Sequence, residues 1–302
     1  MSLAYRVLPE QRRAMLKQLL ETGRGVRAIE AHSGLCALIA NEARSPHAPT
    51  VQFDALWISS LTSSAIQGLP DIELYLLERR IGLIEEVCQV SGLPLIVDGD
   101  TGGDAANLCY LVARLEGMGV SALVIEDKQH PKRNSLCRNA EHVLEDPERF
   151  AKKIAHGIAA RLTDDFLLFA RVESLIAGRT VDDALTRASM YLDAGASGVM
   201  IHAKDFEPDR VIEFLQRLRA RGYPQPVICV PTTYNRILAS VLYEQGASIV
   251  IYANQLLRAA HQAMREVCQD LLVNDRAVAV EERCTSMGEL FALVGVGDNP
   301  AR

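Results

Sequence analysis

Charged and polar residues directly follow most of the short apolar runs in this sequence of 302 residues. A lone buried His or Asp is most often a hydrogen-bonded core residue, because buried polar groups need partners. Six run ends that carry polar groups together favour an active site instead. The residues at these positions are Ser59, Asp98, Asp100, Glu126, Asp127, Lys128, Arg171, Glu173, His202 and Asn254.

The carboxylates among them suggest a metal site. Asp98, Asp100 and Glu126 follow two successive runs, and three uncompensated carboxylates would repel each other unless they were protonated or bound a cation. Oxygen ligands without a nearby Cys or His pair favour Mg²⁺ over zinc, with Mn²⁺ as a second candidate. Mg²⁺ retains several waters, so we expect one direct carboxylate ligand and others through water. A salt-bridged acidic rim is the alternative.

Two later residues and one polar segment could hold an anionic substrate. Arg171 and His202 could form a clamp, since a guanidinium donates two parallel hydrogen bonds to carboxylate or phosphoryl oxygens. The segment EDKQHPKRNSL, residues 126–136, is polar and long for a β–α connection. Such loops are candidates for lids that exclude water, although a solvated surface loop has the same composition.

The positions of these residues depend on eight apolar runs, each followed by a helix-length amphipathic segment. This alternation predicts parallel strands. No GxGxxG follows an early run, so a closed (β/α)8 TIM-type barrel is favoured over an open doubly wound sheet, and its active site would lie at the carboxyl ends of the strands. Glycine turns at 117–120, 194–197 and 245–248 are typical of helix ends. The predicted strands are 26–32, 55–59, 95–98, 122–126, 167–171, 198–202, 227–230 and 248–252.

Length and composition favour one domain over residues 1–302, because a barrel takes about 250 residues and no linker divides the chain. We expect an N-terminal helix at about 9–22, the barrel at about 25–270 and a helical extension at 271–302. Within this part, 255–268 is predicted as the barrel's last helix and 286–293 as a short helix, both from their amphipathicity.

Charge and hydropathy exclude several classes of partner. The net charge is −6 and there is no basic cluster, which argues against nucleic acid. No run approaches the ~20 apolar residues of a membrane span, and the N-terminus lacks the pattern of a secretory signal, so a cytoplasmic location is expected. Seven cysteines without a CxxC pair are interpreted as reduced structural thiols.

The motifs at these positions resemble the phosphoenolpyruvate mutase and isocitrate lyase superfamily, from about residue 25 to 258. Within the lid segment, EDK followed after five residues by NS resembles the mutase signature in particular. The motifs that carry the resemblance are EAHSGL at 30–35, LWISSL at 56–61, VDGDTG at 97–102, EDKQHPKRNS at 126–135, ARVES at 170–174 and MIHAK at 200–204.

The resemblance implies a Mg²⁺-dependent transfer of a phosphoryl group between the enol oxygen and the methylene carbon of phosphoenolpyruvate and phosphonopyruvate. It also implies homo-oligomers, dimers or tetramers, that exchange the last helix. The implied metal residues are Asp98, in direct contact, and Asp100 and Glu126, through water. The implied substrate-binding residues are Trp57, Ser59, Ser60, Leu61 and Ser135. The implied catalytic residues are Asp71, near the travelling phosphorus, Lys132 of the gating loop, and Asn134, Arg171 and His202 around the phosphoryl group.

Rival activities share the fold. Phosphonopyruvate hydrolases are expected to carry threonine at the position of Asn134. Lyases of the superfamily carry a KKCG-like lid, whereas this lid reads PKRNS and Cys137 lacks the following glycine. An oxaloacetate-type hydrolase and a non-catalytic binding barrel are further alternatives.

Two positions depart from the family pattern. Ser60 stands where glycine is more common, and Gly103-Asp104 replaces a YG-type continuation of the metal loop.

Overall fold

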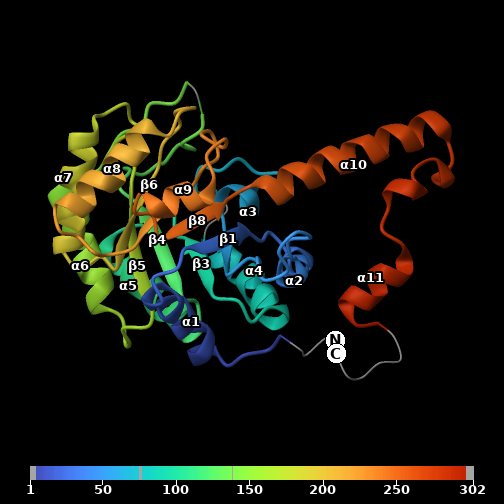
Figure 1. Ribbon diagram of the computed structural model, residues 1–302, viewed down its shortest axis with the longest axis horizontal. Helices are drawn as coiled ribbons and strands as arrows, with labels where there is room; N and C mark the ends of the chain where they lie inside the picture. Colours follow the sequence, from blue (N-terminus) through green and yellow to red (C-terminus); the bar gives the residue numbers. More distant parts are fainter. Residues whose placement is uncertain (1–4, 75–76, 138, 297–302) are drawn as a thin grey trace.

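The computed structural model describes residues 5–74, 77–137 and 139–296. Its eight strands are parallel, and each pairs with the next along the chain until β8 pairs with β1 (Figure 1). This closure confirms the predicted barrel. The strands are β1 Val26–Glu30, β2 Ala55–Ile58, β3 Leu95–Asp98, β4 Ala122–Glu126, β5 Leu167–Val172, β6 Gly198–Ile201, β7 Val227–Cys229 and β8 Ile249–Tyr252.

Helices surround the barrel, and α1 lies at its N-terminal end, where Leu16 is fully buried against the inner residues of the strands. Two short 3-10 turns, Ala277–Ala279 and Glu281–Arg283, follow the longest helix. None of the described helices is both long and apolar enough to cross a membrane. The helices are α1 Pro9–Glu21, α2 Gly34–Glu42, α3 Ser60–Ile66, α4 Leu77–Val90, α5 Ala105–Gly117, α6 Pro147–Ala159, α7 Val181–Asp193, α8 Asp209–Ala220, α9 Ala239–Glu244, α10 Gln255–Asn274 and α11 Met287–Val294.

Alternation along the strands positions the polar residues at the mouth of the barrel. Side chains of successive strand residues point to opposite faces, so one set fills the barrel interior and the other packs beneath the helices. On four strands the interior set includes Ile96, Val124, Phe169 and Met200. Two positions further on, the same face carries Asp98, Glu126, Arg171 and His202. The pleat therefore directs all four polar side chains into one space.

The three predicted glycine turns end α5, α7 and α9. Gly119, Gly195 and Gly246 have φ values of +80°, +97° and +107°, a region that side chains with a Cβ rarely adopt. At Gly119 a Cβ would also lie 2.5 Å from the Cα of Pro9. Glycine at this position thus allows both the turn into β4 and the close approach of α1.

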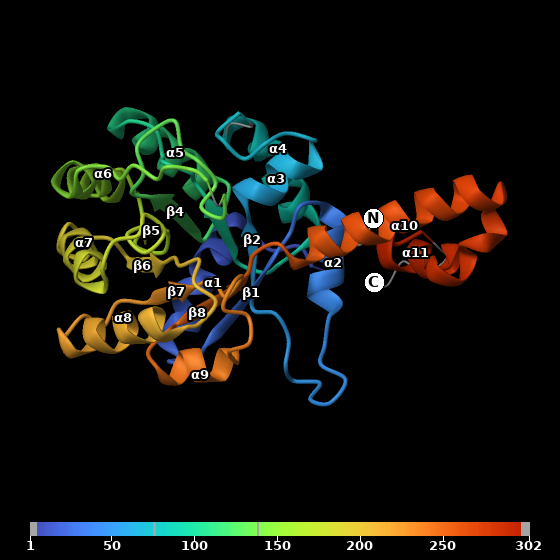
Figure 2. The ribbon, with the colours of Figure 1, turned by 90° about the horizontal axis from the view of Figure 1, so that it is seen from above.

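The C-terminal helices leave the barrel. Helix α10 is longer than the predicted segment 255–268, and none of its residues is buried. It projects away from the strands, and α11 returns beside α2 (Figures 1 and 2). The predicted helices at 9–22 and 286–293 are found within one residue of their expected ends. The division into one domain stays a prediction, and residues 297–302 of the predicted extension lie outside the described residues.

All seven cysteines are free, as expected. The interpretation as structural thiols suits the buried Cys36 and Cys229, whereas Cys88 and Cys109 are half-buried and Cys137, Cys268 and Cys284 are exposed. Cys268 lies on the projecting α10, which has no covering layer in this chain. An amphipathic sequence pattern does not reveal whether a helix face is covered.

Candidate active site

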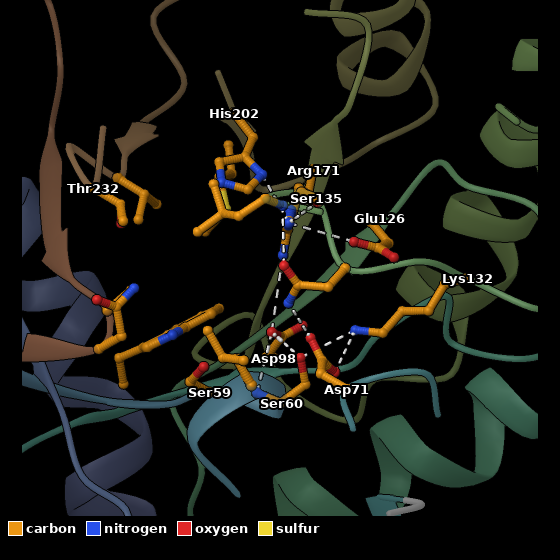
Figure 3. Close-up of a pocket in the computed structure, with 18 residues that line it drawn as sticks. Ser59, Ser60, Asp71, Asp98, Glu126, Lys132, Ser135, Arg171, His202 and Thr232 are labelled. Atoms are coloured by element: carbon orange, nitrogen blue, oxygen red, sulfur yellow. Dashed lines mark hydrogen bonds and ion pairs between the residues drawn. The ribbon is translucent and has the colours of Figure 1, made fainter. Parts of the chain in front are cut away.

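A small cavity lies at the carboxyl ends of the strands, beneath the segment that follows β4 (Figure 3). Its volume is about 50 Å³. Every residue that was predicted to bind the metal or the substrate or to act in catalysis lines it except Asp100. Of the other strand-end residues, Asn254 lines it, whereas Asp127, Lys128 and Glu173 do not. The lining residues are Trp57, Ser59, Ser60, Leu61, Asp71, Asp98, Glu126, Lys132, Asn134, Ser135, Leu136, Arg171, Met200, His202, Val230, Thr232, Ala253 and Asn254.

Asp98 is the central carboxylate of the cavity. Its Oδ2 accepts hydrogen bonds from the hydroxyl of Ser60 at 2.8 Å and from the Ser60 backbone N–H at 3.2 Å. Burial alone would raise the pKa of Asp98, but the cations of Lys132 and Arg171 outweigh this effect and lower the pKa to about 2. Asp98 is therefore ionised. Both Ser60 donors are directed to it, whereas the sequence analysis assigned them to the substrate.

Asp100 lies behind the cavity wall and not in it. A positive φ of 55° at Asp100 bends the chain after β3, and its carboxylate forms ion pairs with Arg80 and Lys132. The Arg80 guanidinium is fully buried and also donates to the backbone oxygen of Asp98 at 2.6 Å. Arg80 therefore fixes the β3 turn. Sequence reasoning missed it, because an arginine in an amphipathic helix usually faces solvent.

Glu126, at the end of β4, is held differently from Asp98. Burial raises the pKa of Glu126 to about 7, because the charges of the nearby Lys128 and Lys132 offset the effect of burial only in part. Its Oε1 is buried without a hydrogen-bond partner. An unsatisfied buried carboxylate oxygen is costly unless an ion or an ordered water contacts it. This donor therefore fits a cation or its bound water.

The donor set suits a hard divalent cation that keeps its water. Asp98 and Glu126 offer only carboxylate oxygen at the cavity wall, as Mg²⁺ and Mn²⁺ prefer. Among the described residues, no three His, Cys, Asp or Glu side chains are grouped for joint direct coordination. The expectation of one direct carboxylate ligand and others acting through water stays a prediction.

Arg171 and His202 form the cationic side of the cavity (Figure 3). The Arg171 guanidinium lies 2.7 Å from Nδ1 of His202, 2.9 Å from Oγ of Ser135 and 3.5 Å from Oε2 of Glu126. Burial and the charge of Arg171 lower the pKa of His202, so the ring is neutral near pH 7. The clamp thus consists of one permanent cation and one neutral imidazole.

Glu173, which follows β5, joins these groups from behind. It is fully buried, and its oxygens contact Nδ1 of His202 at 2.7 Å, Oγ of Ser135 at 2.7 Å and Nζ of Lys128 at 2.9 Å. Although burial would raise the pKa of Glu173, Arg171 and Lys128 lower it well below its usual range. Sequence reasoning placed Glu173 at a strand end but gave it no role. Its position two residues after Arg171, on the same strand face, was the available signal.

The predicted lid segment covers the cavity. Lys132 is buried, and its ammonium lies 3.0 Å from Oδ1 of Asp71 and 3.1 Å from Oγ of Ser60. The Asn134 amide donates to Oδ2 of Asp71 at 2.6 Å. Both oxygens of Asp71, which lies in the connection between α3 and α4, thus contact the lid. The alternative of a fully solvated loop is wrong for this segment.

Thr232, after β7, also lines the cavity but was not predicted. It occupies the interior face two residues beyond Val230, which belongs to the inner core. The same parity that identifies Asp98 and Glu126 would have identified Thr232. Thr232 was not predicted because it does not directly follow the predicted strand 227–230.

A closed β/α barrel with a charged cavity at the carboxyl ends of its strands is the architecture of a barrel enzyme. A family model described as phosphoenolpyruvate phosphomutase matches residues 16–272. The chain therefore belongs to the phosphoenolpyruvate phosphomutase family, within the phosphoenolpyruvate mutase and isocitrate lyase superfamily. The resemblance stated from the motifs is confirmed.

Relatives with two different activities are about equally similar to this chain in sequence. The phosphonopyruvate hydrolase of Variovorax sp. (strain Pal2) is 34% identical, with 93% of each chain covered. The phosphoenolpyruvate phosphomutase of Tetrahymena pyriformis is 32% identical, with 93% of this chain and 90% of the relative covered. Identity of this order assigns the family but does not separate a mutase from a hydrolase.

Solved structures agree with this assignment. The phosphoenolpyruvate phosphomutase from Streptomyces platensis subsp. rosaceus superposes with a TM-score of 0.88 at 38% identity, covering 94% of this chain and 95% of that one. A phosphonopyruvate hydrolase in complex with oxalate and Mg²⁺ superposes with a TM-score of 0.84 at 32% identity, with the same coverage.

Proposed function

We propose that the chain is a phosphoenolpyruvate mutase that interconverts phosphoenolpyruvate and phosphonopyruvate with Mg²⁺. The contact between Asn134 and Asp71, at 2.6 Å, carries this proposal. It brings an amide donor of the lid to the cavity, where a hydrolase of the family is expected to have threonine. The relatives that are mutases and the Mg²⁺ in the related hydrolase structure support it.

The substrate carboxylate would lie at the start of α3, near Ser59 and Leu61, with Trp57 beneath it. The phosphoryl group would lie on the opposite side, against Arg171, His202 and Asn134, with Ser135 as a further contact. Transfer through a loose transition state needs charge stabilisation and fixed positions more than covalent chemistry. A permanent guanidinium and two neutral donors supply this stabilisation without reorganisation.

Mg²⁺, when bound by Asp98 and through water by Asp100 and Glu126, would polarise the oxygens of the pyruvate enolate and hold them in place. Asp98 is ionised and oriented for this role by Ser60. The buried oxygen of Glu126 without a partner is suited to accept from a bound water. Asp100 does not line the cavity, but its backbone N–H donates to Oδ1 of Asp98 at 3.2 Å and its carboxylate pairs with Lys132, and both of these residues line it.

The lid would determine the product. Water that reaches a metaphosphate-like group captures it and gives phosphate, so a mutase must exclude water. Lys132 and Asn134 both contact Asp71, which closes the cavity on the lid side. We therefore assign Asp71, Lys132 and Asn134 to holding the phosphoryl group in a dry cavity during transfer.

Phosphonopyruvate hydrolysis is the second candidate, supported by the similarity to the Variovorax enzyme. Phosphorus NMR of the protein with phosphonopyruvate and Mg²⁺ distinguishes the two. Phosphoenolpyruvate as the first product supports the mutase, and inorganic phosphate with pyruvate supports the hydrolase. Loss of either reaction in EDTA, with recovery on adding Mg²⁺, tests the metal. An inert protein that still binds the substrate would be a non-catalytic barrel.

We also propose that the chain forms dimers or tetramers through α10. This helix has no buried residue, and it exposes Met264, Leu272 and Val273 to solvent in a single chain. Exposed apolar faces of this kind usually mark protein interfaces. Light scattering after size-exclusion chromatography tests the proposal, and a monomer at micromolar concentration would contradict it.

A further inference from the structure

A second cluster of reactive side chains lies where β1 meets α2, outside the cavity described above. The thiol of Cys36 is 3.2 Å from Nε2 of His32, and Nδ1 of His32 is 3.0 Å from Oε2 of Glu30. All three side chains are buried or nearly so, at 9%, 8% and 0% exposure. They belong to the EAHSGL motif and the residue after it, which the proposed function does not use.

The surrounding contacts fix the direction of these hydrogen bonds. Oε1 of Glu30 accepts from the backbone N–H of Leu257 in α10 at 2.7 Å, which leaves Oε2 to accept from His32. Nδ1 of His32 is then the donor, and Nε2 faces the thiol as an acceptor. In many enzymes a nucleophile is activated by an adjacent base, which a third group holds in position. Cys36, His32 and Glu30 have this arrangement.

The environment of the thiol also favours its ionised form. Cys36 occupies the third position of α2, where its backbone N–H donates to the N-cap residue Ser33 at 3.2 Å. The Ser33 hydroxyl lies 3.3 Å from the sulfur and can donate to it. Helix N-termini and imidazolium neighbours both stabilise thiolates.

We propose that Cys36 is a thiolate modification site whose reactants are hydroperoxides, with His32 holding the thiol proton and Glu30 holding His32. In this reaction the thiolate attacks one peroxide oxygen, an S–O bond forms and the O–O bond breaks. The sulfur is oxidised by two electrons to a sulfenic acid, and the peroxide is reduced. The imidazolium of His32 returns its proton to the leaving oxygen as water or alcohol.

The charge balance of the cluster supports this assignment. Although burial opposes ionisation, the bonds from His32 and Ser33 lower the pKa of Cys36. Burial would likewise lower the pKa of His32, but Cys36 and Glu30 raise it to about 10. The titratable groups in contact with His32 are thus Glu30 from β1 and Cys36 from α2. Helix α10 contributes a backbone N–H to Glu30. The other buried cysteine, Cys229, has its pKa raised by burial to about 12.

The rate of alkylation by iodoacetamide, followed for each cysteine by peptide mass spectrometry from pH 5 to 10, tests the thiolate. Cys36 should react with a midpoint below that of an ordinary thiol, which lies at about 8.5. The exposed Cys137 and Cys284 serve as references within the same protein. In His32→Asn the midpoint of Cys36 should rise, which slows its alkylation at pH 6 by about 100-fold. His156→Asn, on the exposed face of α6, is the matched control and should change nothing.

A dimedone-type trap after treatment with hydrogen peroxide tests the oxidation. Sulfenic acid should form first at Cys36, and more slowly in His32→Asn. Glu30→Gln, which keeps the shape of the side chain, should raise the midpoint by less than His32→Asn does. An ordinary midpoint for Cys36 in the unmodified protein, or earlier oxidation of Cys137 and Cys284, would overturn the proposal whether or not the variants fold. Mutase or hydrolase activity plays no part in these readouts, so the outcome is independent of the proposed function.

Discussion

The Nε of Arg171 lies 2.5 Å from Oε1 of Glu173, and both side chains are buried. The cation that faces the cavity is thus paired from behind by a carboxylate that does not line the cavity itself. Charge and orientation of the clamp therefore depend on a residue that the ligand does not touch.

Replacing this carboxylate should weaken both folding and turnover. Glu173→Gln keeps the size but leaves Arg171 and Lys128 without their shared anion, and breaking a buried pair costs about 3–5 kcal/mol. We expect unfolding in urea to show a loss of this order, and kcat to fall by about 10–100-fold, as for other residues that orient a site from behind. Glu213→Gln removes an exposed carboxylate paired with Arg217 and should leave both values almost unchanged.

Removal of the central carboxylate should abolish the reaction through loss of the metal. In Asp98→Ala, the remaining carboxylates cannot hold a hard cation directly, so turnover should fall below about a tenth of the original rate at saturating Mg²⁺. Calorimetry should show loss of Mg²⁺ binding. Asp164→Ala, whose side chain is 88% exposed, serves as the control. Retention of more than about a tenth of the rate in Asp98→Ala would contradict the metal assignment.

The amide of Asn134 should control the fate of the phosphoryl group. Asn134→Thr shortens the side chain and removes its contact with Asp71, which admits water to that side of the cavity. Phosphorus NMR should show a larger share of inorganic phosphate relative to the isomerised product. If total turnover fell with no change in the product ratio, Asn134 would bind the substrate without selecting the outcome.

Two glycines in one turn should respond in opposite ways to alanine. Gly119→Ala combines a φ of +80° with a contact of 2.5 Å to Pro9, and overpacking plus strain should cost about 2–4 kcal/mol. Gly117→Ala lies in the last turn of α5 with open space around it, and should be neutral or stabilising by up to about 1 kcal/mol. Equal destabilisation in thermal and urea unfolding would show that the φ of Gly119 is not the cause.

The sequence predicts the barrel and most of the cavity for one physical reason. Alternation along each strand fixes which residues face inward, so Asp98, Glu126 and Arg171 could be assigned to one space before their distances were known. Contacts that depend on a helix or a long loop follow no such period. The pairing of Arg80 with Asp100 joins α4 to the β3 turn, and neither spacing nor composition indicates it.

The structure beyond the barrel could likewise be predicted only in part from the sequence. The amphipathic pattern located the start of α10 but not its length, because its outer part lies beyond the layer of helices that surround the strands. A residue faces solvent or a neighbour according to tertiary packing, which a local pattern does not contain. The exposed Cys268 is an instance of this.

The pairing of β1 with β8 has a consequence for biosynthesis. Val26 of β1 pairs with Ile249 of β8, which lies more than 200 residues later in the chain. The first strand to be synthesised therefore has no partner on one edge until the last strand has been made. Until Tyr252 has been made, both edges of the nascent sheet keep unpaired backbone groups, which can pair with other chains. A truncation before β8 should therefore yield an open sheet that aggregates, whereas one after Tyr252 leaves the closing ladder intact.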